Sequence, residues 1–364
     1  MQTAIPCSVM RGGTSKGLYF RNEDLPHDRG LRDEVLLAAM GSPDAQQIDG
    51  MGGAHPLTSK VAVISPSNSG DADVDYLFLQ VHVDRADVSD SQNCGNILAG
   101  VAPFAIDEGL VSAGEETTDV RIRMVNTRGI AVARVRTAGG RVNYTGDAKI
   151  DGVPGTAAPV LLEFLDIAGS SCGALLPTGR PVDTIDGVAV TCIDNGMPVV
   201  LLRAGDFGKT GYESPSELES DGELTARIES IRLQAGERMK LGDVKTTTVP
   251  KMSLIAPARN GGAISTRTFI PHRVHDAIGV LGSVSVATAC LLPGSVAQAV
   301  GDTKPVRGIR RLDVEHPTGF FTVEVELDTA QEPLSVLRAA LLRTARLLMR
   351  GTVFVPATIW SGRS

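Results

Sequence analysis

Aromatic side chains and paired cysteines are both scarce in this chain of 364 residues. Phe, Trp and Tyr together make up 4% of it, whereas glycine occurs 40 times and proline 20 times. Such a composition favours a β-rich protein with many tight turns and a core of Val, Ile, Leu and Ala. The five cysteines are far apart and form no Cys-X-X-Cys pair, which argues against a disulfide framework and against a zinc site.

An excess of positive charge and long apolar runs are missing as well. Lys and Arg number 35 against 42 Asp and Glu, and the net charge of −7 argues against nucleic acid or an anionic membrane as a partner. No apolar run reaches the roughly 20 residues of a membrane span, and residues 1–6 do not resemble a signal peptide. We therefore expect a cytoplasmic protein whose partner is a small molecule.

Three pairs of similar segments indicate an internal duplication, with the second copy about 185 to 191 residues after the first. The first pair, at 4–13 and 189–198, is a strand that runs into a glycine turn. The second, at 60–66 and 251–257, is a strand closed by a proline, and the third, at 94–102 and 279–287, is a helix of small residues. Helices so rich in Gly and Ala are weak by propensity, so we expect them to be enclosed by a rolled sheet.

The duplication predicts an α+β fold of two repeated domains, each a curved mixed sheet around a central helix. The first domain is expected at 1–182 and the second at 183–364, with the turn-rich segment 177–181 as the linker. Duplicated domains commonly leave a cleft between them, where ligands bind. Leucines at helical spacing also predict a C-terminal amphipathic helix at about 334–350, which would pack back on one of the domains.

A polar, glycine-rich turn follows the first strand at residues 11–17. Its glycines let backbone N–H groups approach a ligand oxygen, while hydroxyls and basic groups surround them. The order Ser-Lys and the lack of a leading glycine exclude a P-loop, so carboxylate binding is the functional interpretation and an ordinary β-turn the alternative. The candidate binding residues are Arg11, Gly13, Thr14, Ser15 and Lys16.

Cys94 stands at the start of the first small-residue helix, between Asn93 and the pair Gly95 and Asn96. A helix N-terminus favours the thiolate form of a cysteine, and polar neighbours suit a site that faces an anion. The alternative is a buried, inert cysteine, which is the usual fate of a free thiol.

Lys60 follows a glycine-rich loop and begins an apolar strand, and Ser59 just before it is a candidate substrate-binding residue. A lysine that is partly removed from water can act as a base, although most lysines are solvated surface residues. In the second half, Arg267 and His272 precede the second small-residue helix and are candidates for substrate contacts, with Arg267 as a carboxylate clamp. No third ligand with suitable spacing lies near His272 and His275, so we expect no metal there.

These motifs together resemble the PrpF family, and the resemblance extends over nearly the whole chain. It is carried by the segments 10–17, 41–44, 48–53, 58–61, 93–96, 194–198 and 269–272. The resemblance implies the diaminopimelate epimerase-like fold, in which two related domains flank a cleft. It also implies that Lys60 and Cys94 are the catalytic residues.

The chemistry implied by the resemblance is a cofactor-independent 1,3-proton shift, either keto–enol or allylic, in which either residue could be the base. The segments around Cys94 and Cys192 are most similar to the branch that acts on 4-oxalomesaconate in aromatic-acid catabolism. An aconitate or methylitaconate isomerase is the alternative within the family. A non-catalytic polycarboxylate-binding accessory protein is the alternative of another class, and a homodimer is compatible with the sequence.

The duplication adds an independent point about mechanism. The repeat partner of Cys94 is Gly279. Epimerases of the fold that the chain resembles use one cysteine from each domain, so the missing second thiol argues against a two-base racemase.

Overall fold

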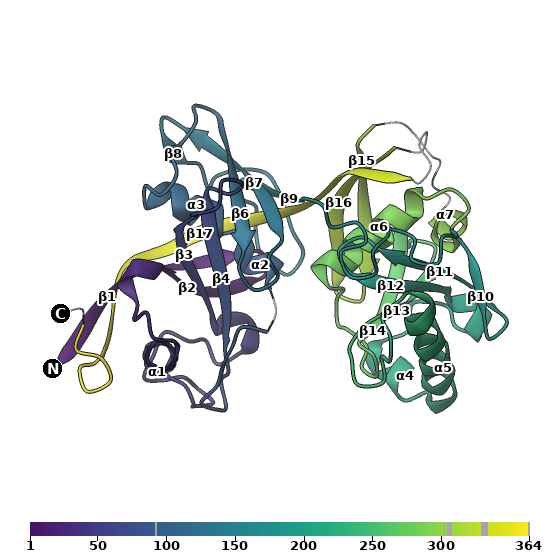
Figure 1. Cartoon of the computed structure of the whole chain (residues 1–364), viewed down its shortest axis with the longest axis horizontal. Helices are drawn as coiled ribbons and strands as arrows, with labels where there is room; N and C mark the ends of the chain where they lie inside the picture. The colour runs from purple at the N-terminus through teal and green to yellow at the C-terminus, as the bar shows by residue number, and fades with distance from the viewer. Residues whose placement is uncertain (92, 302, 304–307, 329–333, 363–364) are drawn as a thin grey trace. The chain divides into compact units, whose positions relative to one another are not determined.

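The computed structural model describes residues 1–364 except 92, 302, 304–307, 329–333 and 363–364, and the chain divides into two compact units (Figure 1). The first unit comprises 1–163 and 343–364, and the second comprises 164–342. This division differs from the expected boundary after residue 182. The turn-rich segment 177–181 lies within the second unit, just before strand β10 (Asp183–Ile185), and the last residues of the chain return to the first unit.

The first unit is built on a mixed sheet whose strands lie in chain order. Antiparallel and parallel pairings alternate along it, starting with an antiparallel pair. The strands are β1 (Gln2–Gly12), β2 (Ser15–Arg21), β3 (Lys60–Pro66), β4 (Val74–Val81), β6 (Thr117–Met124) and β7 (Ile130–Ala138). The shorter strands β5 (Val88–Ser89), β8 (Arg141–Val142) and β9 (Pro159–Phe164) extend it.

The two faces of this sheet carry different helices. Helix α1 (Arg29–Met40) shares a buried core with one face, through Val35, Leu36, Ala39 and Met40. It begins at Asp28, whose side chain accepts a hydrogen bond from the Leu31 N–H, as expected of an N-cap. The short helices α2 (Gly95–Leu98) and α3 (Val101–Asp107) pack on the strands of the unit, and α3 is buried from Val101 to Ile106.

The second unit repeats the strand pairing of the first. Its sheet again alternates antiparallel and parallel pairs in chain order. The strands are β11 (Val188–Asp194), β12 (Pro198–Arg203), β13 (Lys251–Ala256), β14 (Ile264–Phe269), β15 (Arg310–His316) and β16 (Gly319–Asp328). Helix α6 (Val280–Leu291) is buried from Gly282 to Leu291 and packs on four of these strands. The predicted duplication with an enclosed small-residue helix is therefore confirmed.

The remaining helices of the second unit lie outside this repeat of strands. They are α4 (Pro215–Glu219), α5 (Gly222–Arg238) and α7 (Val296–Gly301). Helix α5 buries Leu224, Ile228 and Ile231 in the same core as β11 to β13. In the repeated fold, this core of the second unit is equivalent to the core that α1 forms with the sheet of the first unit.

The predicted C-terminal helix at 334–350 is wrong. Residues 335–356 form one long strand, β17 (Ser335–Pro356). Its beginning pairs with β16 in the second unit, and its later part pairs with β1 in the first. Leucines at helical spacing were a misleading signal, because pairing with two distant strands overrides local propensity.

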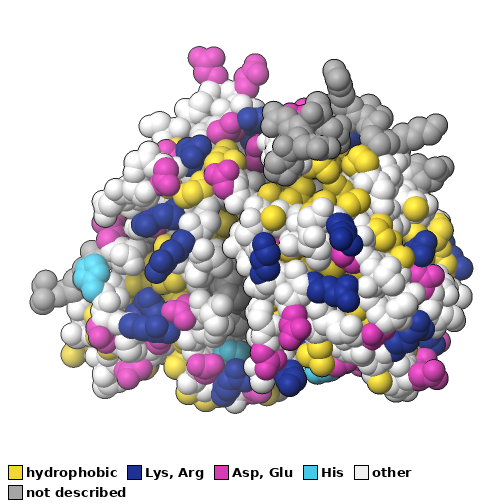
Figure 2. All heavy atoms as spheres, turned by 45° about the vertical axis from the view of Figure 1, so that its right-hand side comes forward, with side chains coloured by type: hydrophobic (Ala, Val, Ile, Leu, Met, Phe, Trp, Pro, Cys, Tyr) yellow, Lys and Arg dark blue, Asp and Glu magenta, His cyan; other side chains and the backbone are white. Residues whose placement is uncertain are grey.

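All five cysteines are free thiols, and four of them are buried. Among the described residues no helix is long and apolar enough to cross a membrane. Figure 2 shows basic and acidic side chains interspersed on the face that it displays, which is in keeping with the modest net negative charge.

Candidate active site

The candidate site begins with a row of paired residues across the first four strands. Met10 pairs with Gly17, Gly17 with Lys60, and Lys60 with Gln80. Directly paired residues of neighbouring strands share a face, so Lys60 and Gln80 point to the same side of the sheet. At Gly17 a Cβ would lie 2.3 Å from the Lys60 carbonyl oxygen, so only glycine allows β2 to approach the start of β3 this closely.

Lys60 is held by neutral partners. Its side chain is buried, its Nζ donates to Gln80 Oε1 at 2.6 Å, and it lies 5.0 Å from the centroid of the Phe78 ring. The Gln80 amide is oriented in turn, because its Nε2 donates to the carbonyls of Ser59 at 2.9 Å and Pro56 at 3.1 Å. An amine with a neutral acceptor can gain or lose a proton without breaking an ion pair.

A second glutamine fixes the loop that precedes Lys60. Gln47 is buried, and its Nε2 donates to Ser42 Oγ at 2.9 Å and to Ser59 Oγ at 2.8 Å, while its Oε1 accepts from the Ala54 N–H at 2.9 Å. Ser59 Oγ donates to the Val81 carbonyl at 2.9 Å. The Ser59 hydroxyl, which was expected to bind substrate, is therefore engaged in supporting the start of β3.

Cys94 caps helix α2, as the sequence predicted, but this helix has only four residues. A helix of one turn has a small macrodipole, so the expected dipole effect on the thiol is weak. Tyr76 Oη donates to the Cys94 carbonyl at 3.3 Å, and Tyr19 Oη donates to the Ile97 carbonyl at 2.6 Å. Burial, and next the nearby charge of Cys94, raise the pKa of both tyrosines, which keeps their hydroxyls as donors.

The cation that acts on Cys94 is Arg343. This side chain is 2% exposed and lies on β17, in the part that belongs to the first unit. Burial lowers the pKa of Arg343 to about 9, and negative charge on Cys94 acts in the opposite direction. The two groups thus interact electrostatically.

The turn 12–15 lies against α2. Gly13 has a φ of 51°, and a Cβ there would lie 2.1 Å from Asn96 Oδ1. Thr14 Oγ1 accepts a hydrogen bond from Asn96 Nδ2 at 3.1 Å. The structure thus brings together Gly13, Thr14, Cys94, Gly95 and Asn96, as the sequence predicted.

Three buried polar atoms in this region have no hydrogen-bond partner within the described part of the chain. They are Ser15 Oγ, Asn93 Oδ1 and Asn96 Oδ1. Buried polar atoms are normally paired, so these three atoms are candidate contacts for a ligand or a water molecule. Asn93 is anchored on its other side, where its Nδ2 donates to Thr127 Oγ1 at 2.5 Å.

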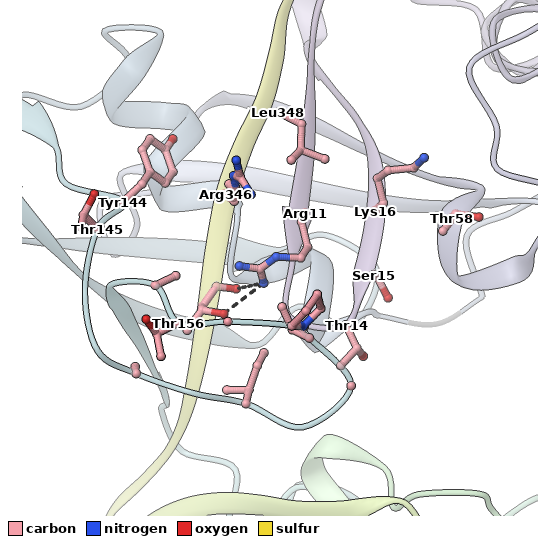
Figure 3. A pocket seen from close by; sticks show the side chains of 18 residues that line it. Arg11, Thr14, Ser15, Lys16, Thr58, Tyr144, Thr145, Thr156, Arg346 and Leu348 are labelled. Atoms are coloured by element: carbon pink, nitrogen blue, oxygen red, sulfur yellow. Dashed lines mark hydrogen bonds between the residues drawn. The ribbon is translucent and has the colours of Figure 1, made fainter.

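Arg11 and Lys16 lie elsewhere than sequence reasoning expected. They pair directly with each other, one residue along from the Met10–Gly17 pair, so their side chains point to the opposite face of the sheet from Lys60. There they line a cavity of about 500 Å³, shown in Figure 3, which Thr14 and Ser15 also line. Neither Lys60 nor Cys94 lines this cavity.

The two candidates from the second half belong to the second unit. Arg267 lies on β14, where its Nε donates to the Glu213 carbonyl at 2.6 Å and its Nη1 to the Thr266 carbonyl at 2.8 Å. Burial lowers the pKa of Arg267, while Glu213 and Glu315 oppose this. His272 is exposed in the turn after β14.

Sequence reasoning missed three residues of this site. Gln80 had a signal, since it is a polar residue in an otherwise apolar stretch of strand. Gln47 and Arg343 had none that could be read locally, and Arg343 fell within the helix that was wrongly predicted. Among the described residues no group of three or more His, Cys, Asp or Glu side chains is arranged to hold a metal ion.

The match to known proteins covers almost the entire chain. The model of the family described as "PrpF protein" matches residues 2–356. The chain belongs to the PrpF family. Among PrpF relatives, 4-oxalomesaconate tautomerase of Pseudomonas putida is 60% identical over 99% of both chains. The (4E)-oxalomesaconate Delta-isomerase of a Novosphingobium species is 61% identical over 96% of this chain and 97% of its own.

A solved structure agrees with the fold. The crystal structure of methylitaconate-delta-isomerase is 35% identical and superposes with a TM-score of 0.86, covering 100% of this chain and 98% of its own. The predicted diaminopimelate epimerase-like α+β fold is thereby confirmed. The prediction of an isomerase is confirmed at the level of enzyme class, since these PrpF relatives are isomerases and tautomerases.

Proposed function

We propose that this enzyme shifts a proton within 4-oxalomesaconate, as a tautomerase or a Δ-isomerase. The observation that carries the proposal is the buried Lys60 amine, which donates to the neutral Gln80 amide. The two side chains point to the same face of the sheet. The identity of about three residues in five to two relatives that are named for this acid supports the choice of substrate.

In the proposed mechanism one group removes a proton from carbon and another returns a proton two atoms away. We assign the removal to Lys60 and the return to Cys94, with the reverse assignment as an outcome of the test below. The intermediate is a dienolate, whose charge would be stabilised by the Ser15 hydroxyl and by Arg343. One proton leaves and one returns, so the reaction needs no oxidant and no electron carrier.

The remaining predicted contacts support this site to different degrees. Gly13, Thr14, Asn93, Gly95 and Asn96 surround the Cys94 turn and form the proposed substrate cradle. The substrate roles of Arg11, Lys16, Ser59, Arg267 and His272 stay predictions. The five free thiols fit a reducing compartment, so we place the enzyme in the cytoplasm, with a homodimer as the proposed assembly.

Proton NMR of the purified protein with 4-oxalomesaconate in D₂O tests the proposal, with cis-aconitate as the parallel substrate. Deuterium in oxalomesaconate together with a new tautomer or double-bond isomer would support it, and the labelled carbon separates the two reactions. Labelled positions in Lys60 and Cys94 variants assign base and acid.

Two other outcomes would each replace the proposal. Turnover of cis-aconitate alone would favour allylic isomerisation of a simpler acid, in line with the methylitaconate-delta-isomerase structure. Binding of oxalomesaconate without exchange of either acid would favour a polycarboxylate-binding accessory protein.

A further inference from the structure

Three basic side chains stand side by side across three neighbouring strands of the first unit. Lys16 on β2 pairs directly with Arg11 on β1, and Arg11 pairs directly with Arg346 on β17. Paired residues of neighbouring strands share a face, and like charges in such positions destabilise a sheet. The fold keeps this unfavourable row even though the whole chain has a net charge of −7.

No carboxylate within the described ranges forms a salt bridge with any of the three cations. Arg350, further along β17, differs, because it pairs with Asp107 at 3.3 Å and with Glu108 at 3.2 Å. Burial and then the charge of Arg346 lower the pKa of Arg11, which is the effect expected of cations that repel each other. The mutual repulsion of the three cations is therefore not offset by a neighbouring carboxylate, and a bound anion would relieve it.

The row borders the cavity of about 500 Å³, and no acidic residue is among the described residues that line it. Figure 3 shows Arg11, Lys16 and Arg346 on adjacent strands, with Thr145 and Thr156 on a loop beside the strand of Arg346. Arg11 Nη1 donates to the carbonyls of Gly13 at 2.8 Å and Thr344 at 3.0 Å, and this fixes the guanidinium. Its other N–H groups have no protein acceptor among the described residues, so they are available to a ligand.

The size of the row selects the kind of anion. Neighbouring strands lie about 4.8 Å apart, so the backbone positions of the three residues span about 10 Å. A carbon chain with carboxylates at both ends spans such a row, whereas a single phosphate or acetate meets one or two of its members. Guanidinium groups also match the geometry of carboxylates well.

We propose that this cavity is a second ligand site, separate from the sheet face of Lys60, and that it binds a small di- or tricarboxylate. Alternation along β1 and β2 places its cations on the opposite face of the sheet from Lys60. Thr14 lines the cavity and also accepts the hydrogen bond from Asn96, so the two sites meet at this turn. The inference does not depend on the proposed reaction.

Isothermal titration with citrate tests the site without any turnover. We expect Arg346→Gln to weaken citrate binding at least tenfold and Arg346→Lys to retain it, because the row needs the charge. Arg141→Gln is the matched control, since Arg141 is an exposed cation on β8 of the same unit, outside the cavity. Lys60→Ala should bind citrate as tightly as the unaltered protein does.

Several results would overturn the inference. One is that Arg346→Gln and Arg141→Gln bind citrate with equal affinity. Another is that Lys60→Ala no longer binds citrate. Acetate or inorganic phosphate that binds as tightly as citrate would reject the polycarboxylate class. Because the titration measures binding alone, it can fail while the NMR test of the proposed function succeeds, and the reverse also holds.

Discussion

The start of β3 in the first unit and the start of β13 in the second are the same place in the duplicated fold. Each strand begins with a lysine, Lys60 or Lys251, and each pairs in parallel with the strand before it. The neighbour of Lys60 on that strand is Gly17, whereas the neighbour of Lys251 is Val199. Burial, and then the charge of Arg232, lower the pKa of Lys251 to about 8.

The helices that follow differ in a parallel way. Cys94 caps α2, whereas Gly279 caps α6. The second unit thus keeps the strand pairing and a lysine but has no thiol in the equivalent position. Duplication therefore preserved the scaffold, while the proposed chemistry also needs a thiol, which only the first copy has at this position.

The largest expected effect comes from removing each lysine in turn. Lys60→Ala should lower turnover of 4-oxalomesaconate by roughly 10³-fold, because a proton-transfer group contributes about 10² to 10⁴. Lys251→Ala, the matched control, should stay within about twofold of the unaltered enzyme. Steady-state kinetics measures both variants. Equal losses of turnover would show that Lys60 and Lys251 do not differ in function.

The next effect concerns the thiols. Cys94→Ala should lower turnover about 10²-fold, whereas Cys192→Ala in the core of the second unit should leave the rate nearly unchanged. Burial raises the pKa of Cys7 to about 11 and those of Cys172, Cys192 and Cys290 to about 12, so these four remain protonated near pH 8. Mass spectrometry after brief alkylation of the native protein should find label on Cys94 first. Label on any other cysteine ahead of it would contradict this assignment.

A smaller effect is expected for Gln80, which positions Lys60. Gln80→Leu removes the acceptor at 2.6 Å and should lower turnover roughly tenfold. Gln80→Glu should instead form an ion pair that stabilises the protonated amine, so activity would rise only at higher pH. A pH–rate profile that matches the unaltered enzyme in both variants would show that Gln80 has only a structural role.

The smallest effect is on stability and concerns Lys251. Its pKa is lower in the folded protein than in the unfolded chain, so the folded state holds fewer protons between about pH 8 and 10.5 and stability rises across this range. Lys251→Met should therefore stabilise the protein at pH 7 by about 1 kcal/mol, and the gain should shrink towards pH 10. Chemical denaturation at both values measures it, with the exposed Lys149→Met as control. A gain that does not depend on pH would point to packing instead.

Much of the scaffold could be predicted from local sequence patterns. Strands closed by Gly or Pro at 4–13, 60–66, 189–198 and 251–257 were recognisable, because strand propensity and turn chemistry act over a few residues. The candidate pair Lys60 and Cys94 was recognisable for the same reason, since each stands at the boundary of an element. The repeat then exposed Gly279 as a partner without a thiol.

Tertiary structure alone decided the rest, because strand pairing joins residues that are far apart in the chain. It turned residues 335–356 into a strand and so brought Arg343 near Cys94. It set Gln80 opposite Lys60 through the register of β3 and β4. It also turned Arg11 and Lys16 away from Lys60, because side chains alternate between the two faces of a strand and only the register says which face is which.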